Sequence, residues 1–314
     1  FQQDGDTFQW VWRDWVVRAL NADMTFDQFS IEQLAGDLLP NPTQEQLIAT
    51  AFNRNHLLNG EGGAIPEEQR FNILFDRVDT TSTTWMGLTM ACAQCHDHKY
   101  DPMTQRDYYS LMSIFNQVSE DGRAGPGPGA KRIAPPFLEM VTEENKRHLA
   151  EIEAKKTKAE ADGQVKEKMD LAFASWQSEV TPDIRVGPRN IPLKADITSV
   201  LRIAADKRTP EQTKGLQKGL RTTFENEVWP ALAAKDPALK QAEDLKKELV
   251  AYKNEGVPRV MVMRDDKARD TFILSRGEYL KPLDKVTGTT PAFLPPPVKG
   301  APQNRLGFAQ WLFQ

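Results

Sequence analysis

The sequence predicts a mainly α-helical protein, and three observations support this fold class. Apolar residues recur at helical spacing through most of residues 1–121. From residue 141 onward, highly charged segments carry a thin apolar seam with the alternating four-and-three spacing of a coiled coil. Only two short stretches, 258–264 and 269–276, alternate in the manner of β-strands.

Four regions are therefore expected along the chain. They are a compact helical domain over 1–121, a Gly/Pro-rich linker over 122–140, a charged and coiled-coil-like antiparallel helical hairpin over 141–256, and a last region over 257–314. The last region should contain a small β-hairpin, an extended proline-rich tail and, from Asn304, the first helix of a following domain.

Short helices joined by short links are expected in the first region. Capping residues mark their starts, namely Thr7, Thr25 with Gln28, Thr43, Pro66 and Thr104 with Asp107. The run of Thr and Ser over 80–84 has poor helix propensity, so we expect a kink or break there. Between the third and fourth helices, the glycine-rich loop 53–65 combines Arg54, His56 and Glu61, which is a composition typical of a site.

The charged helices of the third region have a simple interpretation. One seam runs through Leu149 and Ile152 to Val165 and Trp176 and is interrupted near Gly163, and a second seam runs from Ala238 to Tyr252. The two segments are expected to pair antiparallel as a solvated hairpin that braces the fold. The alternative is an arm that docks a partner.

Composition excludes two classes of partner. The chain has 314 residues, of which 39% are hydrophobic and 27% charged, with a formal net charge of −4. This length is sufficient for a substantial core. The negative charge and the lack of a basic stripe argue against nucleic acid. Because no run of about 18 apolar residues occurs, no transmembrane segment is expected.

The motif that organises the chain is Cys92-Ala93-Gln94-Cys95-His96. It contains the only two cysteines, in the Cys-x-x-Cys-His order that covalent haem c attachment requires. Each thiol would bind one haem vinyl group, and the adjacent His96 imidazole would be the proximal iron ligand. Residues 1–121 are therefore expected to be a haem c domain.

Three other interpretations of the cysteine pair are weaker. A zinc site needs four ligands and usually a second pair, which the sequence lacks. A thioredoxin-like redox pair should follow a strand, and no strand pattern precedes Cys92. A lone disulfide remains the third alternative. Because haem c is attached outside the cytoplasm, we expect a mature or excised piece of an exported protein, located in the periplasm or at the cell surface.

The sequence does not determine the identity of the distal iron ligand. His98 is too close to His96 to cross the haem and is expected to bind a propionate or the backbone. His56 is the preferred candidate, and the position could also be unligated. The alternative methionine ligands are Met86, Met90, Met103, Met112, Met261 and Met263.

Three functional hypotheses follow from these alternatives. A six-coordinate haem would transfer electrons to a redox partner protein, another cytochrome or a subunit of a larger assembly. An open distal site would instead allow catalysis, as in a peroxidase-like enzyme, with Arg54, His56 and Glu61 as acid/base residues. In the third hypothesis haem is structural and the helical arm serves assembly. Glu61, Glu67, Asp97 and Asp101 are a weaker possibility for a calcium site.

The chain resembles the large exported planctomycete cytochrome-type proteins that contain the domains of unknown function 1549 and 1553. The segments that carry the resemblance are 15–21, 32–40, 59–63, 76–81 and 92–102, with 260–263 and 276–280 further along. Residues 304–312 resemble the start of the second domain, and Phe272 stands where the family has a histidine. The resemblance implies a haem c protein of an exported electron-transfer or oxidative system.

Overall fold

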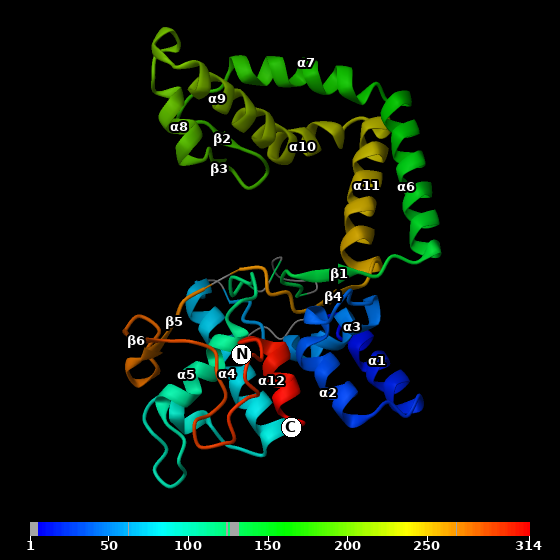
Figure 1. Cartoon of the computed structure of the whole chain (residues 1–314). Coiled ribbons are helices and arrows are strands. Elements are labelled where there is room, and N and C mark those ends of the chain that lie inside the picture. Colours follow the sequence, from blue (N-terminus) through cyan, green and yellow to red (C-terminus); the bar gives the residue numbers. More distant parts are fainter. Residues whose placement is uncertain (1–5, 62, 124, 126–131, 268) are drawn as a thin grey trace. The chain divides into compact units, whose positions relative to one another are not determined.

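The computed structural model describes residues 6–61, 63–123, 125, 132–267 and 269–314. The chain divides into two compact units (Figure 1). The first comprises Phe1–Met140 and Val257–Gln314, and the second comprises Val141–Gly256. Helices dominate both units, which confirms the mainly α-helical prediction. Within the described residues, no helix combines the length and the apolar character needed to cross a bilayer.

Six α-helices are found among the described residues of the first unit. They are α1 (Trp10–Asn21), α2 (Phe26–Ala35), α3 (Gln44–Ala49), α4 (Pro66–Thr81), α5 (Gln105–Phe115) and α12 (Arg305–Trp311). Four 3-10 turns accompany them, namely η1 (Gly36–Leu38), η2 (Thr50–Arg54), η4 (Ala91–Gln94) and η8 (Ser275–Gly277). A π-helical turn, η3 (Ser82–Met86), follows α4 directly. The expected break near 80–84 is therefore confirmed as a widening of the helix.

The helix starts agree only partly with the capping residues predicted above. Thr43 and Thr104 form complete capping boxes at the starts of α3 and α5. Thr25 is the N-cap of α2, but its side chain makes no capping hydrogen bond, because its hydroxyl bonds to Asp27 instead. The prediction of Thr7 as the cap of α1 is wrong, since Gln9 occupies that position with helical backbone angles.

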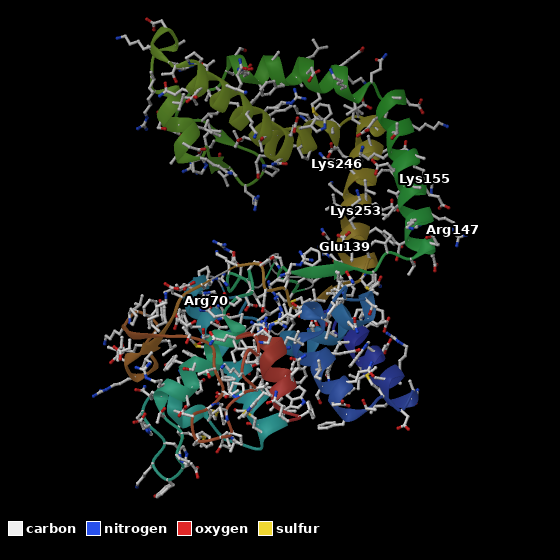
Figure 2. The ribbon with its side chains drawn as sticks, viewed as in Figure 1. Arg70, Glu139, Arg147, Lys155, Lys246 and Lys253 are labelled. Carbon is white, nitrogen blue, oxygen red and sulfur yellow. The ribbon has the colours of Figure 1, made fainter. Side chains whose placement is uncertain are left out.

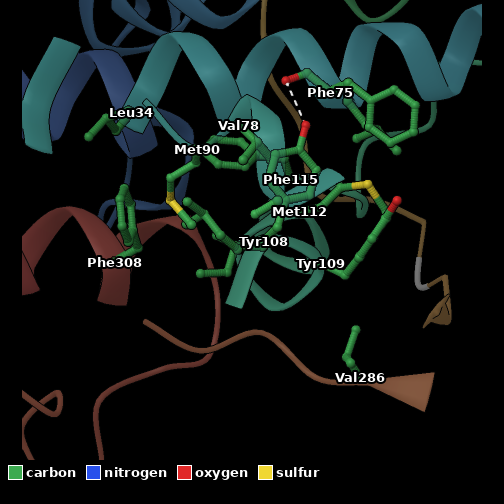
Figure 3. Packing of buried hydrophobic residues seen from close by; sticks show 14 of the residues in the cluster. Leu34, Phe75, Val78, Met90, Tyr108, Tyr109, Met112, Phe115, Val286 and Phe308 are labelled. Carbon is green, nitrogen blue, oxygen red and sulfur yellow. Dashed lines mark hydrogen bonds between the residues drawn. The ribbon is translucent and has the colours of Figure 1, made fainter. Parts of the chain in front are cut away.

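Two clusters form most of the core of the first unit. The larger cluster joins α2, α4, α5 and α12 to the strand region near residue 274, and Figure 3 shows its central residues. Tyr108, Met112 and Phe115 of α5 are fully buried at its centre. The smaller cluster packs α1 and α3 against Val260 and Val262. Trp15 belongs to this second cluster and stacks on Phe29 at 5.5 Å between ring centroids, which is ordinary core packing.

The strand pairing differs from the predicted hairpin of 258–264 with 269–276. Strand β4 (Arg259–Met261) pairs antiparallel with β1 (Phe137–Glu139), and β5 (Thr271–Leu274) pairs antiparallel with β6 (Pro282–Val286). After β4 the chain enters the core, where the Met263 amide donates to Thr50 Oγ1 at 2.9 Å. The predicted pairing is therefore wrong, because each segment pairs with a different strand.

The second unit contains α6 (Glu143–Asp162), α7 (Val165–Ser178), α8 (Ala195–Leu201), α9 (Pro210–Thr223), α10 (Trp229–Ala233) and α11 (Pro237–Ala251). Its shorter elements are β2 (Arg185–Val186) paired with β3 (Ile191–Pro192), the 3-10 turn η5 (Ala205–Lys207), and the π turns η6 (Phe224–Val228) and η7 (Tyr252–Gly256). Exposed charged side chains cover α6 and α11, as the labelled Arg147, Lys155 and Lys246 illustrate (Figure 2).

Helices α6 and α11 run antiparallel. At one end Asn145 Nδ2 donates to the Tyr252 hydroxyl at 2.9 Å, and at the other end Gly163 lies against Ala238. The predicted seam does not continue beyond this point, because Gln164 adopts a left-handed conformation with φ of +49° and redirects the chain. The part from Val165 to Trp176 lies on α7 and packs against Phe224 and Trp229 instead.

Candidate functional site

The Cys-x-x-Cys-His motif occupies one helical turn at the surface of the first unit. Turn η4 carries Cys92, and its end places Cys95 and His96 on the same short segment. The Cys92 carbonyl accepts hydrogen bonds from the amides of Cys95 at 3.3 Å and His96 at 3.4 Å. Both thiols are free and exposed, and the His96 side chain is exposed as well. The three reactive groups are therefore available to one ligand.

The His96 ring has a defined orientation. Its Nδ1 lies 2.8 Å from the carbonyl oxygen of Asp97. Because a carbonyl only accepts hydrogen bonds, Nδ1 carries a proton in this contact, and in the neutral ring the lone pair is then on Nε2. A histidine whose Nδ1–H bonds to a carbonyl and whose Nε2 is bare has the form that ligates a metal. Two thiols and this imidazole therefore fit the requirements of haem c attachment.

Residues of helix α5 hold the motif through hydrogen bonds. Ala93, between the two cysteines, is fully buried in the larger core cluster. The Gln94 carbonyl accepts hydrogen bonds from the Tyr109 hydroxyl at 2.8 Å and from Gln105 Nε2 at 3.2 Å. The Asp97 carboxylate accepts from the Gln105 amide at 2.8 Å. The middle of the motif is thus fixed to the core while its two cysteines face solvent.

His98 bonds to the backbone, as the sequence predicted. Its Nδ1 accepts from the Asp101 amide at 2.9 Å, and its own amide donates to the Met103 carbonyl at 2.8 Å. These two bonds close the loop 97–103 on itself. His98 is therefore a loop-forming residue on the same segment as His96.

His56 lies in a buried ionic cluster, which we call the Arg54–Glu120 cluster and define as His56, Arg54, Arg77 and Glu120. Arg77 donates through Nη1 and Nη2 to both carboxylate oxygens of Glu120, the second bond measuring 2.7 Å. Arg54 Nη1 is 3.2 Å from Glu120 Oε2, an ion pair without hydrogen-bond geometry, and its Nη2 donates to the Ala134 carbonyl at 2.9 Å. All four side chains are buried.

Charge and burial act together on this cluster. Burial raises the pKa of Glu120, but the charges of Arg77 and Arg54 outweigh it and lower that pKa to about 2. Burial, followed by the charges of Arg77 and Arg54, lowers the pKa of His56 to about 3. His56 is therefore neutral, with Nδ1 bonded to the Leu57 carbonyl at 3.1 Å and Nε2 without a partner among the described residues.

Among the described residues, no hydrogen bond or ion pair joins His56 to the motif, and the two are linked to different residues of α4. Arg77, beside His56, and Asp79 project about 200° apart around this helix. Asp79 is close enough to the Tyr108 hydroxyl for each to act on the pKa of the other, and Tyr108 is close enough to Cys95 for a charge there to act on it. For His56 to ligate an iron held by His96, its ring would have to leave the cluster and pass α4. Its assignment as the distal ligand thus stays a prediction that needs a rearrangement.

The remaining predicted site residues are also dispersed. Glu61 is exposed on its loop, whereas Arg54 is fully buried. Five of the six candidate methionines are buried in the core, namely Met90, Met103, Met112, Met261 and Met263, and Met86 is partly buried. Among the described residues, no three His, Cys, Asp or Glu side chains are grouped so as to hold a metal ion. In particular, Glu67 pairs with Arg70, and Asp101 lies against His98.

Asp79 is a titratable group of α4 with a shifted pKa. Burial raises its pKa to about 6, the Tyr108 hydroxyl opposes this shift, and Asp76 adds to it. One carboxylate oxygen, Oδ1, has no partner among the described residues. The side chain is half-buried, so solvent screens part of its charge. Asp79 therefore destabilises the folded state once it ionises.

We expect Asp79→Asn to stabilise the protein at pH 8 by about 1 kcal/mol and to leave it unchanged or weaker at pH 4. Because the folded-state pKa is raised, the folded protein holds the Asp79 proton more tightly than the unfolded chain does. The stability of the unaltered protein is therefore undiminished by Asp79 below about pH 4 and is reduced as pH rises through about 6. Urea unfolding at both pH values measures the difference. The exposed Asp206→Asn serves as control, and an equal gain in both variants would contradict the assignment.

Several residues of this site carry no signal in the sequence. Arg77 and Glu120 look like ordinary helix and loop charges, and they are 43 positions apart. Tyr109 reads as one of several core aromatics of α5, although it holds the motif. A buried Arg bonded to a distant carboxylate becomes visible only when the chain is folded.

Comparison with known proteins gives one match. No curated protein and no solved structure matches the chain significantly. Residues 1–120, which contain α1 to α5 and the Cys-x-x-Cys-His motif, match the family model described as PSCyt2, Protein of unknown function (DUF1549). The predicted resemblance to the domain of unknown function 1549 is thus confirmed for this part of the chain.

Proposed function

We propose that the protein carries one haem c, attached through Cys92 and Cys95 with His96 as the proximal iron ligand, and transfers electrons. The observation that carries this proposal is the exposed turn η4, where two free thiols adjoin an imidazole with its Nε2 lone pair available. This is the donor set that haem c requires, in the required order.

The chain's own residues supply the environment of the group. His96 Nδ1–H donates to the Asp97 carbonyl, which fixes the ring and raises the basicity of Nε2. Tyr109 and Gln105 hold Gln94, so the two thiols keep their separation. When bound, haem supplies a single-electron couple whose potential depends on ligation and exposure. At an exposed motif, an edge of the group would be accessible to a partner.

A second candidate function is catalysis at an open distal site, and the burial of the potential distal ligands favours it. His56 and five methionines are enclosed in the core, whereas Cys92, Cys95 and His96 are exposed. His96 would then be the residue that holds the iron at this surface, and the haem would supply a binding site for water or a small substrate. Arg54 is not available as an acid/base residue in this arrangement, because it pairs with Glu120.

The proposal includes an exported location and a redox partner. Haem c attachment takes place outside the cytoplasm, so the protein would act in the periplasm or at the cell surface. Its partner would be another cytochrome or a subunit of a larger assembly.

Covalent haem should be lost completely in the double variant Cys92→Ala/Cys95→Ala. The reason is that both thioether bonds disappear and His96 alone cannot retain haem under denaturing conditions. The measurement is a haem stain after denaturing electrophoresis of protein exported from a strain that matures haem c. His148→Ala, on α6 of the second unit, is the control and should stain fully. A stained band in the double variant would show that the proposal is wrong.

Absorption spectra of the folded, exported protein distinguish the two functions. A low-spin spectrum that does not change with cyanide or carbon monoxide indicates two axial ligands and an electron carrier. A high-spin spectrum that shifts at once indicates an open site and favours catalysis. His56→Ala decides the distal ligand, since only a ligating His56 would convert a low-spin spectrum into a high-spin one.

A further inference from the structure

The connection between β5 and β6 reaches the Cys-x-x-Cys-His motif from a distant part of the sequence. It comprises Ser275–Lys281 and is closed by three backbone hydrogen bonds of 2.9–3.1 Å, one of which joins the Ser275 amide to the Lys281 carbonyl. Arg276 and Gly277 both have positive φ, of +54° and +76°. Two successive left-handed residues turn the chain sharply, so the tip of this connection is Gly277.

Gly277 lies directly against the second cysteine. A Cβ atom built on Gly277 would be 3.3 Å from Cys95 Sγ and 3.0 Å from Gln94 Nε2. The Gln94 amide is the end of a flexible side chain and can move away at little cost. Cys95 Sγ would have to give by a few tenths of an ångström, and rotation about its own Cα–Cβ bond, which redirects the thiol, provides this shift. The absence of a side chain at 277 therefore permits the present position of the sulfur.

Tyr109 fixes the distance between this connection and the motif. Its hydroxyl donates to the Gln94 carbonyl at 2.8 Å, and the Leu274 amide faces the same oxygen closely enough to act on the pKa of Tyr109. One phenol oxygen thus joins the end of β5 to turn η4. Because Tyr109 is itself fully buried on α5, neither segment can move relative to the other without breaking these bonds.

We propose that Ser275–Lys281 forms a wall of the haem attachment site and that Gly277 is a positioning residue for the Cys95 thiol. This inference rests on the proposed function. In the attachment reaction a thiol adds to a vinyl group, so that the sulfur bonds to one carbon and the thiol proton goes to the other, with no change in net oxidation state. Two thiols must meet two vinyl groups at a fixed separation, which makes the direction of Cys95 Sγ decisive.

The test compares glycines with the same backbone strain but different surroundings. Gly277→Ala and Gly277→Asn both place a Cβ against Cys95, and Asn tolerates the left-handed conformation better. Gly300→Ala is the matched control, because Gly300 has φ of +89° and no atom within 4 Å of a built Cβ. Each variant is exported from a strain that matures haem c, and its alkaline pyridine complex is recorded after reduction.

The expected result is loss of the Cys95 thioether in both Gly277 variants, with haem retained through Cys92. The α band then moves to longer wavelength, because one vinyl group remains unreacted. Gly300→Ala should keep the band of the unaltered protein. Unchanged bands in both Gly277 variants would overturn the inference and leave the proposed function intact. If the unaltered protein carries no covalent haem, the proposed function is wrong. The inference that Ser275–Lys281 forms a wall of the attachment site is then wrong as well.

A second readout does not depend on haem. In protein made without haem maturation, and with Cys92→Ala so that one thiol remains, Gly277→Ala should raise the rate of Cys95 labelling by a neutral maleimide. The sulfur then rotates away from Ser275–Lys281 toward solvent. The same substitution at Gly300 should leave the rate unchanged. Equal rates in all three proteins would overturn the positioning role of Gly277.

Discussion

Glu120→Gln should lower the free energy of unfolding by about 3–5 kcal/mol. Glu120 is the sole carboxylate of the Arg54–Glu120 cluster, and both arginines pair with it. Its removal leaves two guanidinium groups buried beside the neutral His56, with no counter-charge in the cluster. Glutamine keeps the shape and one acceptor oxygen, so the loss reports the missing charge rather than a cavity.

The same substitution should alter the response to acid. The folded-state pKa of Glu120 is lowered to about 2, so its contribution is complete above about pH 4.5 and is lost as pH falls toward 2. The unaltered protein should therefore lose stability steeply between these values. Glu120→Gln should start lower at pH 7 and fall less, since the titrating group is absent.

Chemical unfolding at pH 7 and pH 3 measures both effects. Glu45→Gln is the matched control, because Glu45 pairs with Arg18 at 2.7 Å while both side chains are more than half exposed. Such surface pairs contribute less than about 1 kcal/mol. If Glu120→Gln and Glu45→Gln unfold at the same denaturant concentration, the cluster does not stabilise the fold as described.

Arg305→Leu should lower the free energy of unfolding by about 3–5 kcal/mol, because it removes one partner of a buried ion pair on α12. Arg305 is fully buried and binds Asp37 bidentately at 2.8 and 2.6 Å, with Asp265 at 2.8 Å from Nη2. Burial disfavours its charge, but Asp37 and Asp265 outweigh burial and hold the pKa of Arg305 above its ordinary value. Leucine would leave two buried carboxylates facing each other.

This variant has a specific signature besides lower stability. At least one of the two carboxylates must take up a proton, so Arg305→Leu should gain stability on acidification from pH 8 to pH 5 relative to the unaltered protein. Arg106→Leu is the control, since Arg106 and Asp284 form a pair in which both side chains are more than half exposed. A pH response equal to that of the control would show that Arg305, Asp37 and Asp265 do not form a buried charged group.

The local features of the first unit followed from local chemistry. The capping boxes at Thr43 and Thr104 and the start of α4 at Pro66 depend on residues within one turn, so the sequence predicted them correctly. The Cys92-x-x-Cys95-His96 motif is local in the same sense. Its spacing alone predicts haem c attachment, and the structure adds that both thiols are exposed.

Pairings between distant segments did not follow from the sequence. Alternation at 258–264 and 269–276 predicted two strands that pair with each other, but β4 pairs with β1 and β5 with β6. A strand pattern specifies which face is buried and leaves the partner open, because any neighbouring edge can satisfy the same hydrogen bonds. Burial of Val260 and Val262 against α1 and α3 selects the partner.

The sequence by itself determined the mainly helical fold, several helix starts of the first unit and the three residues proposed to hold haem. Only the tertiary structure decided that His56 lies with Glu120 on one side of α4, and that Gly277 lies against Cys95. The physical reason is the range of the interactions. Caps and motifs act over three or four residues, whereas buried charges and close backbone contacts join residues whose separation in sequence carries no information about their distance in space.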